Sequence, residues 1–410
     1  MADRSAAVTD ATLSVVIAGT AFGYPEGSGA AARTRAYAKG LMENGARVHV
    51  VSLLPPGRRG AGMNPAPSGV HEGVSFEYAC GTRTRRSTFL GRRLLEARLP
   101  IGLWRAARRH FAVTPGPRAV IAYSDQPTWI AITALVARSL RARCVVEVCE
   151  VPLVSERSPA RLALRRWLLD AVAYRLVDGF IAISTYLEDY LRQRVPSGTP
   201  IIRVPILVAA EEFTAGAGAL PDQAEGQIVF VGALGVEGEV PDLLDAFSRV
   251  TADHPDVVLK LVGDGSLAVR EGLSAQVAQL GLHDRVVFAG WARREDLPGV
   301  LGAATVLVLP RRDALFSQAG FPNKLGEYLA SGRPVVTTVT GEIASHLTDG
   351  ETAYLVPPGD TAAFAAKICD VLDHPLEAAA VGLGGHDLAV RRFDRRRHGA
   401  RLREFLCAPG

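Results

Sequence analysis

The stretch that decides the fold is Gly320-Phe-Pro-Asn-Lys-Leu-Gly-Glu-Tyr-Leu-Ala-Ser-Gly-Arg-Pro-Val-Val-Thr-Thr338. Pro322 ends the preceding segment and Asn323 can cap a helix, so the pattern predicts a helix that begins at Lys324 and stops at Gly332. The first backbone N–H groups of such a helix have no partner within it. The β-branched run at the end of the stretch predicts a buried parallel strand. A helix followed at once by such a strand indicates an α/β protein.

The start of this helix has the features of a phosphate cradle. Backbone N–H groups and the helix dipole favour an anion, and Lys324 adds a positive charge at the same end. Gly326 lets a phosphate approach closely, and Glu327 lies about one turn further on, where a carboxylate can accept a hydrogen bond from a sugar hydroxyl. An ordinary capped helix with an exposed lysine and glutamate would show the same local pattern, and that alternative stays open for the segment by itself.

At these residues the chain resembles the nucleotide-sugar signature of retaining glycosyltransferases with the GT-B fold, in particular glycosyltransferase family 4. The most similar branch is exopolysaccharide-type and carries Gly-Phe-Pro-x-Lys-Leu-x-Glu-Tyr-Leu-Ala. The resemblance implies an α/β protein of two Rossmann-like, doubly wound domains that face each other across a cleft. It also implies retaining transfer of a sugar from a nucleoside diphosphate to an acceptor hydroxyl, with no metal or other cofactor.

The chain departs from the family pattern at two places. Family members usually carry Glu-x7-Glu; Glu327 fills the second position, but Ala319 stands at the first. An arginine and a lysine usually hold the diphosphate where this chain has Ala233 and Gly238. We expect Lys324 together with the arginines at 311 and 312 to replace that clamp. The alternatives are a catalytically silent sugar-nucleotide-binding partner, a pseudo-glycosyltransferase or a sugar-nucleotide epimerase.

The first half of the chain alternates predicted strands and helices. A strand at 13–18, a glycine-rich loop, a helix at 30–44 and a strand at 47–53 form a βαβ unit. Later strands end where polar residues appear, and ligands of open α/β sheets lie beyond such strand ends. Asp125 and Glu150 are therefore predicted to line the cleft and to orient the acceptor hydroxyl or take part in its proton transfer. A plain structural role for both carboxylates is the alternative.

The second half repeats the pattern, with predicted strands at 227–231, 257–262 and 305–309. Combined with the resemblance, it defines the predicted sites. The predicted catalytic residues are Lys324, Glu327, Asp125 and Glu150. The predicted donor-binding residues are Gly27, Ser28, Gly29, Gly232, Gly263, Asp264, Gly265, Arg311, Arg312, Phe321, Pro322, Asn323, Lys324, Leu325 and Glu327.

A chain of 410 residues with 48% apolar residues can bury two cores. We expect an acceptor-binding domain at 12–200, a donor-binding domain at 226–385 and a segment at 386–410 that crosses back to the first domain. Residues 196–227 are predicted to be a linker and 55–69 a mobile loop. The five cysteines lack metal-binding spacing, and neither a signal peptide nor a membrane-spanning run is visible. A cytoplasmic protein with reduced thiols and no metal site is expected.

The charges are distributed unevenly. Residues 1–200 hold 27 bases and 15 acids, whereas 201–410 hold 19 and 27. Between Arg83 and Arg118 there are ten arginines and one acid, mixed with leucines, Ile101 and Trp104. This composition, and that of a second basic and apolar helix predicted at 159–177, suits an anionic membrane surface or an anionic or lipid-linked acceptor. A solvated basic face is the alternative.

Nucleic acid is not expected as a partner, because the basic clusters lack aromatic residues suited to base stacking.

Overall fold

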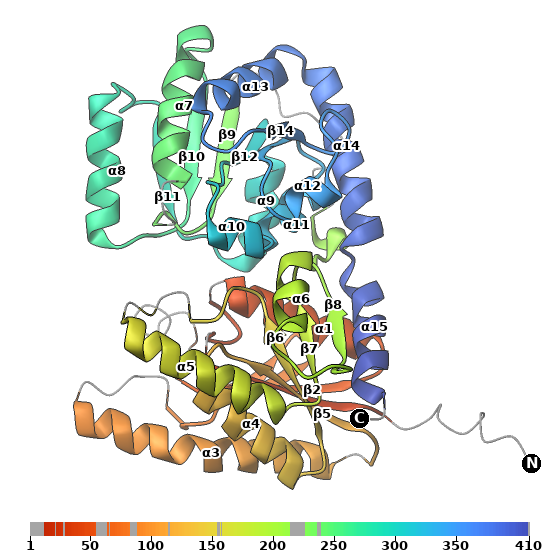
Figure 1. Ribbon diagram of the computed structural model, residues 1–410. Coiled ribbons are helices and arrows are strands. Elements are labelled where there is room, and N and C mark those ends of the chain that lie inside the picture. Colours follow the sequence, from red (N-terminus) through yellow and green to blue (C-terminus); the bar gives the residue numbers. More distant parts are fainter. Residues whose placement is uncertain are drawn as a thin grey trace, which may run out of the picture. The chain divides into compact units, whose positions relative to one another are not determined.

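The computed structural model describes residues 12–20, 22–27, 29–54, 64, 66–82, 88–113, 115–153, 156, 158–213, 226–235 and 239–408. The chain divides into two compact units (Figure 1). Unit 1 comprises Met1–Leu207 and Arg395–Gly410, and unit 2 comprises Val208–Asp394. The predicted crossing point at 386 lies inside helix α14 (Pro375–Arg392), so the chain returns to unit 1 only after that helix.

Unit 1 is built on an eight-stranded sheet with the order β3-β4-β2-β1-β5-β6-β7-β8. Neighbouring strands are parallel except β3, which runs antiparallel to β4. The strands are β1 (Ser14–Gly19), β2 (Arg47–Ser52), β3 (Ser68–His71), β4 (Val74–Tyr78), β5 (Arg118–Tyr123), β6 (Arg143–Val148), β7 (Gly179–Ala182) and β8 (Ile201–Arg203). The predicted strands correspond to β1, β2, β5, β6 and β7 within one residue at each end.

Helices cover both faces of this sheet. Val15 and Ile17 of β1 share a core with Tyr37 and Leu41 of α1 and with Leu402 of α15. Val16 lies between them on the opposite face and is equally buried. Helix α4 contacts both α3 and α5, which places these three helices side by side. The helices of unit 1 are α1 (Gly29–Glu43), α3 (Phe89–Ala112), α4 (Pro127–Ser139), α5 (Pro159–Ala171), η1 (Ala173–Arg175), α6 (Thr185–Arg192) and α15 (Arg395–Cys407).

Helix α15 docks on α1 through two glycines. A Cβ atom on Gly399 would lie 2.2 Å from the Gly40 carbonyl oxygen, and one on Gly40 would lie 2.4 Å from the Arg395 carbonyl oxygen. Only glycine allows the two backbones to come so close. Arg395 also forms an ion pair of 2.9 Å with Glu43. The last helix is thereby fixed to unit 1.

The predicted linker at 196–227 is wrong over its first part. Residues 201–203 form β8, and the segment that follows is buried. Its carbonyl groups at Val204 and Pro205 accept hydrogen bonds from Arg33, a fully buried arginine on α1 whose Nε lies 2.6 Å from Glu147 on β6. The remainder, 214–225, lies outside the described residues, as do 55–63 and 65 of the predicted mobile loop.

Unit 2 is a six-stranded parallel sheet with the order β11-β10-β9-β12-β13-β14. The order reverses direction between β9 and β12, which is where open α/β sheets bind ligands. The strands are β9 (Gln227–Val231), β10 (Val258–Val262), β11 (Val286–Gly290), β12 (Val306–Leu309), β13 (Val335–Thr338) and β14 (Tyr354–Val356). Besides α14, the helices are η2 (Ala210–Glu212), α7 (Glu239–Asp253), α8 (Leu267–Gln279), η4 (Arg294–Asp296), α9 (Leu297–Gly302), α10 (Leu315–Ala319), α11 (Asn323–Ala330), α12 (Ile343–His346) and α13 (Thr361–Asp373).

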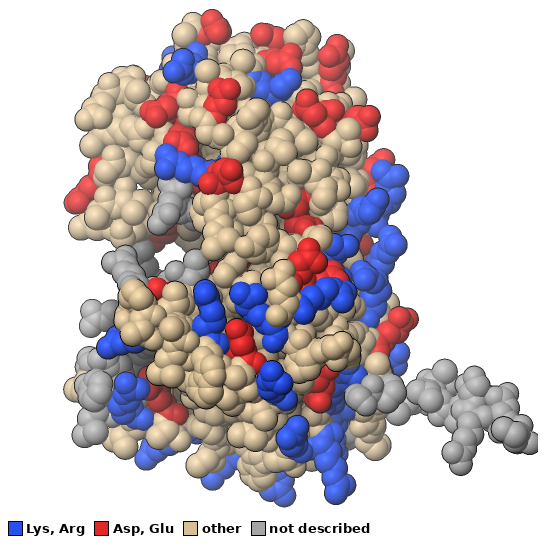
Figure 2. Space-filling model, in the orientation of Figure 1, with Lys and Arg blue, Asp and Glu red and all other residues tan. Residues whose placement is uncertain are grey.

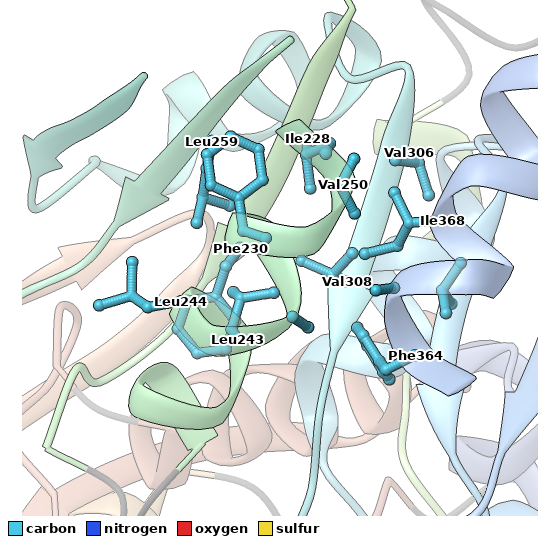
Figure 3. Close-up of a cluster of buried hydrophobic side chains, with 14 of the residues drawn as sticks. Ile228, Phe230, Leu243, Leu244, Val250, Leu259, Val306, Val308, Phe364 and Ile368 are labelled. Atoms are coloured by element: carbon cyan, nitrogen blue, oxygen red, sulfur yellow. The ribbon is translucent and has the colours of Figure 1, made fainter. Parts of the chain in front are cut away.

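The core of unit 2 lies between the sheet and helices α7 and α13. Leu243 and Leu244 of α7 and Phe364 and Ile368 of α13 pack against the apolar side chains of the central strands, such as Phe230 (Figure 3). All five side chains are at most 3% exposed. This rigid layer fixes the strand ends at which β9 and β12 meet.

Candidate functional site

Two glycines shape the strand ends in unit 2. Gly232 follows β9 and Gly263 follows β10. Gly263 has φ of +149°, and a Cβ atom there would lie 1.8 Å from the Gly232 carbonyl oxygen. A Cβ atom on Gly232 would lie 2.5 Å from Nζ of Lys324. The two predicted donor-site glycines thus let two backbone turns touch and leave space for the lysine.

The helix that carries Lys324 begins one residue earlier than predicted. Helix α11 starts at Asn323, and Pro322 rather than Asn323 is its N-cap, without a side-chain cap hydrogen bond. The N–H group of Leu325 donates to the Pro322 carbonyl at 2.9 Å, so this donor is already used. The expectation that the first N–H groups of the helix are available for a ligand is therefore wrong for Leu325.

Tyr328 ties α11 to the end of β9. Its hydroxyl accepts a hydrogen bond of 2.6 Å from the N–H group of Val231 and donates one of 3.2 Å to the carbonyl of the same residue. Tyr328 is fully buried, and burial raises the pKa of its hydroxyl far above the usual value. The hydroxyl therefore stays protonated and works as a structural clamp that sets Lys324 beside Gly232.

Lys324 is half-buried, with a side chain that is 19% exposed. Its Nζ is 4.4 Å from the ring centroid of Phe230 and 3.5 Å from Oε2 of Glu239. Burial lowers the pKa of Lys324, the Glu239 carboxylate opposes that shift, and the positive charge of Arg311 adds to it. The ammonium group is thus held at the switch point of the sheet between a ring and a carboxylate.

Glu239 is a site residue that the sequence pattern missed. It is fully buried at the first position of α7, and its other oxygen, Oε1, lies 3.5 Å from Nη1 of Arg311. Both contacts are longer than the approximately 2.7–2.9 Å of a tight charge-assisted hydrogen bond. Glu239 therefore neutralises part of the positive charge of Lys324 and Arg311 without forming a tight hydrogen bond to either. Because proline favours the first turn of a helix, the sequence pattern starts this helix at Pro241 and leaves Glu239 in the preceding loop.

The two predicted arginines have different surroundings. Arg311 is 8% exposed, lies over the ring of Phe316 at 5.0 Å and joins the Lys324–Glu239 cluster. Burial lowers its pKa, but the group remains a cation. Arg312 forms two hydrogen bonds of 2.6 Å with Asp242 on α7. Of the pair, only Arg311 is brought together with Lys324.

Glu327, one turn along α11 from Lys324, contacts a second residue that the sequence pattern missed. Arg294 of η4 donates from Nη1 to Oε1 of Glu327 and from Nη2, at 3.2 Å, to Oε2 of Glu212. Its guanidinium lies 5.1 Å from the ring centroid of Phe213. The three residues are far apart in sequence, so no spacing pattern could have joined them.

Several predicted donor-binding residues serve packing. Phe321 is 3% exposed and stacks on His346 at 5.1 Å, and Leu325 is fully buried. Asp264 accepts a hydrogen bond of 2.8 Å from the N–H group of Gly265 and so closes the turn after β10. Ala319, at the position of the family's first glutamate, is fully buried, whereas Ala233 is exposed.

Unit 1 carries the remaining predicted residues. Asp125 and Glu150 follow the adjacent parallel strands β5 and β6, and partial burial together with the charge of Asp125 raises the pKa of Glu150. Gly27 lies in the loop before α1, and Gly29 begins that helix. Ser28 and Gly238 lie outside the described residues. The two carboxylates thus follow neighbouring strand ends of unit 1, near enough for the charge of Asp125 to act on Glu150.

Comparison with known proteins connects both units to one group of enzymes. Residues 225–374 match the family model "Glycosyl transferases group 1", and residues 28–206 match "Glycosyl transferase 4-like domain". The chain is a glycosyltransferase family 4-like protein with the GT-B fold. The family expectation drawn from the Gly320 segment is therefore confirmed.

The relatives differ in substrate and agree in fold. One is the GDP-mannose-dependent alpha-(1-6)-phosphatidylinositol monomannoside mannosyltransferase of Mycolicibacterium smegmatis, 32% identical over 166 residues, which are 40% of this chain and 43% of that protein. The chain thus spans less than half the length of this curated relative. Sucrose-phosphate synthase from Thermosynechococcus elongatus has a TM-score of 0.70 at 21% identity, over 96% of this chain and 98% of that one. Anabaena HepE in complex with UDP-glucose has a TM-score of 0.69 at 17% identity, over 96% and 100%.

Among the described residues, no group of three or more histidine, cysteine, aspartate or glutamate side chains is arranged to hold a metal ion. Within the same part of the chain, no helix is long and apolar enough to cross a membrane.

Proposed function

We propose that this protein is a retaining glycosyltransferase that moves a sugar from a nucleoside diphosphate to an acceptor hydroxyl. The observation that carries the proposal is the pair of the half-buried Lys324 and the buried Arg311 at the switch point of unit 2, with Glu327 one turn along the same helix as Lys324. A cation pair followed by a carboxylate suits a diphosphate followed by a hydroxyl-bearing sugar. The mannosyltransferase relative is named for a GDP-sugar and HepE is solved with UDP-glucose, which supports this class of donor.

The chemical step needs fixed positive charge. When the bond between the sugar and the diphosphate breaks, negative charge gathers on the leaving oxygen. Two cations that are already in place, one buried and one half-buried, stabilise this charge without reorganisation, and their removal from water strengthens the effect because the local dielectric constant is lower. Lys324 and Arg311 thus perform the task for which other enzymes use a divalent ion. We include metal-independent turnover in the proposal for this reason.

In the retaining reaction that we propose, the acceptor hydroxyl attacks on the face from which the diphosphate leaves. A donor phosphate oxygen takes the proton, so no protein base is required. Asp125 and Glu150 are assigned to orienting the acceptor hydroxyl. The raised pKa of Glu150 suits a carboxylate that hydrogen-bonds to a hydroxyl or shares its proton.

The acceptor side is proposed to work at an anionic membrane surface, on the cytoplasmic side, with an anionic or lipid-linked acceptor. Helices α3, α4 and α5 form a layer that exposes five large apolar side chains, each more than half exposed: Leu94, Ile101, Leu135, Leu164 and Trp167. Exposed arginines surround them at positions 93, 98, 105, 108, 138, 161 and 166. In Figure 2 the visible face of unit 1 carries more basic than acidic side chains. Exposed apolar groups within a basic surface favour anionic lipid.

A catalytically silent sugar-nucleotide-binding partner is the second candidate. Buried Ala319, where the family carries a glutamate, favours it, because no carboxylate reaches the transferred sugar from that position. This candidate predicts nucleotide binding without turnover. Only an assay of sugar hydrolysis and transfer distinguishes it from the first candidate.

The test is a hydrolysis and transfer assay with a panel of UDP-, GDP- and TDP-sugars, with a cell extract as the source of acceptors and mass spectrometry as the readout. Nuclear magnetic resonance of the product gives the anomeric configuration, and a parallel reaction contains excess EDTA. Transfer with retention in EDTA supports the proposal. Nucleotide binding without hydrolysis or transfer would favour the silent partner, an inverted product would overturn retention, and loss of turnover in EDTA that manganese restores would overturn metal independence.

A further inference from the structure

Arg294 connects two carboxylates in unit 2. It belongs to η4, the short turn after β11, and contacts Glu327 through Nη1 and Glu212 through Nη2. Glu327 belongs to α11 and Glu212 to η2, so the guanidinium joins three separate elements. The side chains of Arg294 and Glu327 are 22% and 15% exposed, respectively. This is a partly buried bridge rather than a surface ion pair.

The position of the guanidinium is restricted from three directions. A carboxylate lies at each of its two terminal nitrogens, and the buried ring of Phe213 lies 5.1 Å away. A planar guanidinium with a rigid set of donors loses little further freedom in such a setting. Arg294 contacts Oε1 of Glu327, and an ionised carboxylate can accept on both oxygens. Oε2 of Glu327 is therefore the oxygen left for a ligand hydroxyl.

The charges along α11 change sign within one turn. Lys324 lies in a cluster with Arg311 and Glu239 that has a net charge of +1, whereas Glu327, one turn further along, presents a carboxylate. The first cluster suits the diphosphate of a donor. The carboxylate suits hydroxyl groups, which donate hydrogen bonds to it.

We propose that Arg294 is a positioning residue of the donor site, which holds Glu327 turned so that its free oxygen accepts a ribose hydroxyl of the nucleotide. This inference rests on the proposed function, in which α11 binds a nucleoside diphosphate. Without Arg294, Oε1 of Glu327 would lose the donor that fixes it. Glu327 would then turn away, and the ribose would lose its acceptor.

The experiment measures recognition of the ribose rather than activity. Calorimetry with UDP, GDP, ADP and CDP identifies the nucleoside diphosphate that binds the wild-type protein most tightly. Its affinity is then compared with that of its 2′,3′-dideoxy form in the wild type and in Arg294→Gln, Glu327→Gln and Arg293→Gln. Arg293 is the matched control, because it neighbours Arg294 but is exposed and pairs only with Glu295 and Asp296 among the ion pairs of the described residues.

We expect the wild type and Arg293→Gln to bind the ribose form about tenfold more tightly than the dideoxy form, the usual effect of a hydrogen bond to a charged group. Arg294→Gln and Glu327→Gln should both bind the two forms almost equally. Should Arg294→Gln fail to fold, Arg294→Lys replaces it, since an ammonium group does not reproduce the two-carboxylate geometry and should lose part of the discrimination.

The possible results separate the two proposals. If Glu327→Gln loses ribose discrimination and both Arg294 variants keep it, the role of Arg294 is overturned while the donor site stands. If Glu327→Gln keeps full discrimination, Glu327 does not contact the ribose, and the assignment of α11 fails with it. If none of the four nucleotides binds the wild type, the proposed function and this inference are both overturned.

Discussion

The carboxylate of Glu239 lies 3.5 Å from the ammonium of Lys324, and Glu239 is fully buried while Lys324 is half-buried. An acid at this position is unexpected in a site for a diphosphate, because it opposes the ligand's charge. Its second oxygen is equally far from Arg311, so one carboxylate serves two cations. The arrangement keeps two neighbouring cations compatible with folding in the absence of ligand.

The first prediction therefore concerns Glu239→Gln. Removing the carboxylate leaves Lys324 and Arg311 without their counterion, and breaking a buried ion pair from one side costs about 3 kcal/mol or more of folding stability. Nucleoside diphosphate should bind about tenfold more tightly, because one opposing charge is gone. Urea unfolding and calorimetry measure the two effects. The control is Glu96→Gln, which removes an exposed i,i+3 pair with Arg93 and should cost less than about 1 kcal/mol. Weaker nucleotide binding would show that Glu239 orients Lys324 for the ligand.

The second prediction compares two glycines. Gly232→Ala places a methyl group 2.5 Å from Nζ of Lys324, the mobile end of a flexible side chain. The protein should fold with a loss below about 1 kcal/mol, while the displaced lysine weakens diphosphate binding by about tenfold. Gly263→Ala instead meets a backbone oxygen at 1.8 Å with φ at +149° and should lose at least about 2 kcal/mol of stability. Equal stabilities of the two variants would contradict this account of the loop.

Much of this fold follows from local sequence. The β-branched runs predict β9 and β13 with their observed ends, since parallel strands buried on both faces need continuous apolar residues. Strand β3 was missed because its short, exposed sequence has no alternation to detect. The predicted start of α11 is wrong by one residue, since Pro322 rather than Asn323 is the N-cap. This difference is within the usual uncertainty of helix ends.

The candidate site residues that the sequence could indicate are those marked by a local pattern or by the family resemblance. Lys324 and Glu327 occupy one helix face, and the glycine loops follow strands, so pattern and resemblance suffice for them. Arg294 is 33 residues from Glu327 and 82 from Glu212, and such a contact depends on strand order, which spacing does not reveal. Glu239 was missed because a buried acid and a solvated acid at a helix start look identical in sequence.

The third prediction concerns Glu327→Ala. Loss of a charged hydrogen-bond partner should weaken nucleotide-sugar binding by about 1–3 kcal/mol. The fold should survive, because Arg294 keeps its contact with Glu212. Calorimetry with the donor identified in the transfer assay gives the affinity, and circular dichroism reports the fold. An unchanged donor affinity would remove Glu327 from the site.

The fourth prediction is a pH effect in unit 1. His110 is buried on α3, stacks on His49 at 5.5 Å and has a pKa lowered to about 4, chiefly by burial and then by His49. Between pH 6.5 and about 4 the unfolded chain binds a proton that the folded chain refuses, so stability falls as the pH falls through this window. The full contribution is about 3 kcal/mol, at about 1.4 kcal/mol per pKa unit.

His110→Gln should remove this contribution while the exposed His283→Gln keeps it. Urea unfolding at pH 7.0, 6.0 and 5.0 measures the difference in free energy of unfolding between each variant and the wild type. For His110→Gln that difference should change by about 1–2 kcal/mol in favour of the variant as the pH is lowered. A difference that stays constant with pH would show that His110 becomes protonated in the folded protein at no extra cost.

The last prediction tests the basic face of unit 1. If α5 meets an anionic membrane, Leu164 and Trp167 enter the interface and Arg161 and Arg166 contact lipid headgroups, each arginine contributing about 1 kcal/mol. Vesicles with anionic lipid should sediment the wild-type protein at low salt, and far less of it at 0.5 M salt, where the Debye length falls to about 4–5 Å. The variant Arg161→Ser/Arg166→Ser should lose the vesicle binding that salt weakens. The variant Leu164→Ser/Trp167→Ser should lose the vesicle binding that persists at 0.5 M salt.

The matched control for this test is Leu267→Ser/Leu376→Ser, which removes two leucines that are more exposed than Leu164 and Trp167 from unit 2, where acids outnumber bases. It should sediment like the wild type, because an exposed apolar side chain without a basic surround gains little at an anionic surface. Vesicles of neutral lipid should sediment all four proteins far less than anionic vesicles do at low salt. If the wild type stays in the supernatant with anionic vesicles at low salt, the basic face does not bind membranes, and its arginines would instead hold an anionic soluble acceptor or form a solvated basic face.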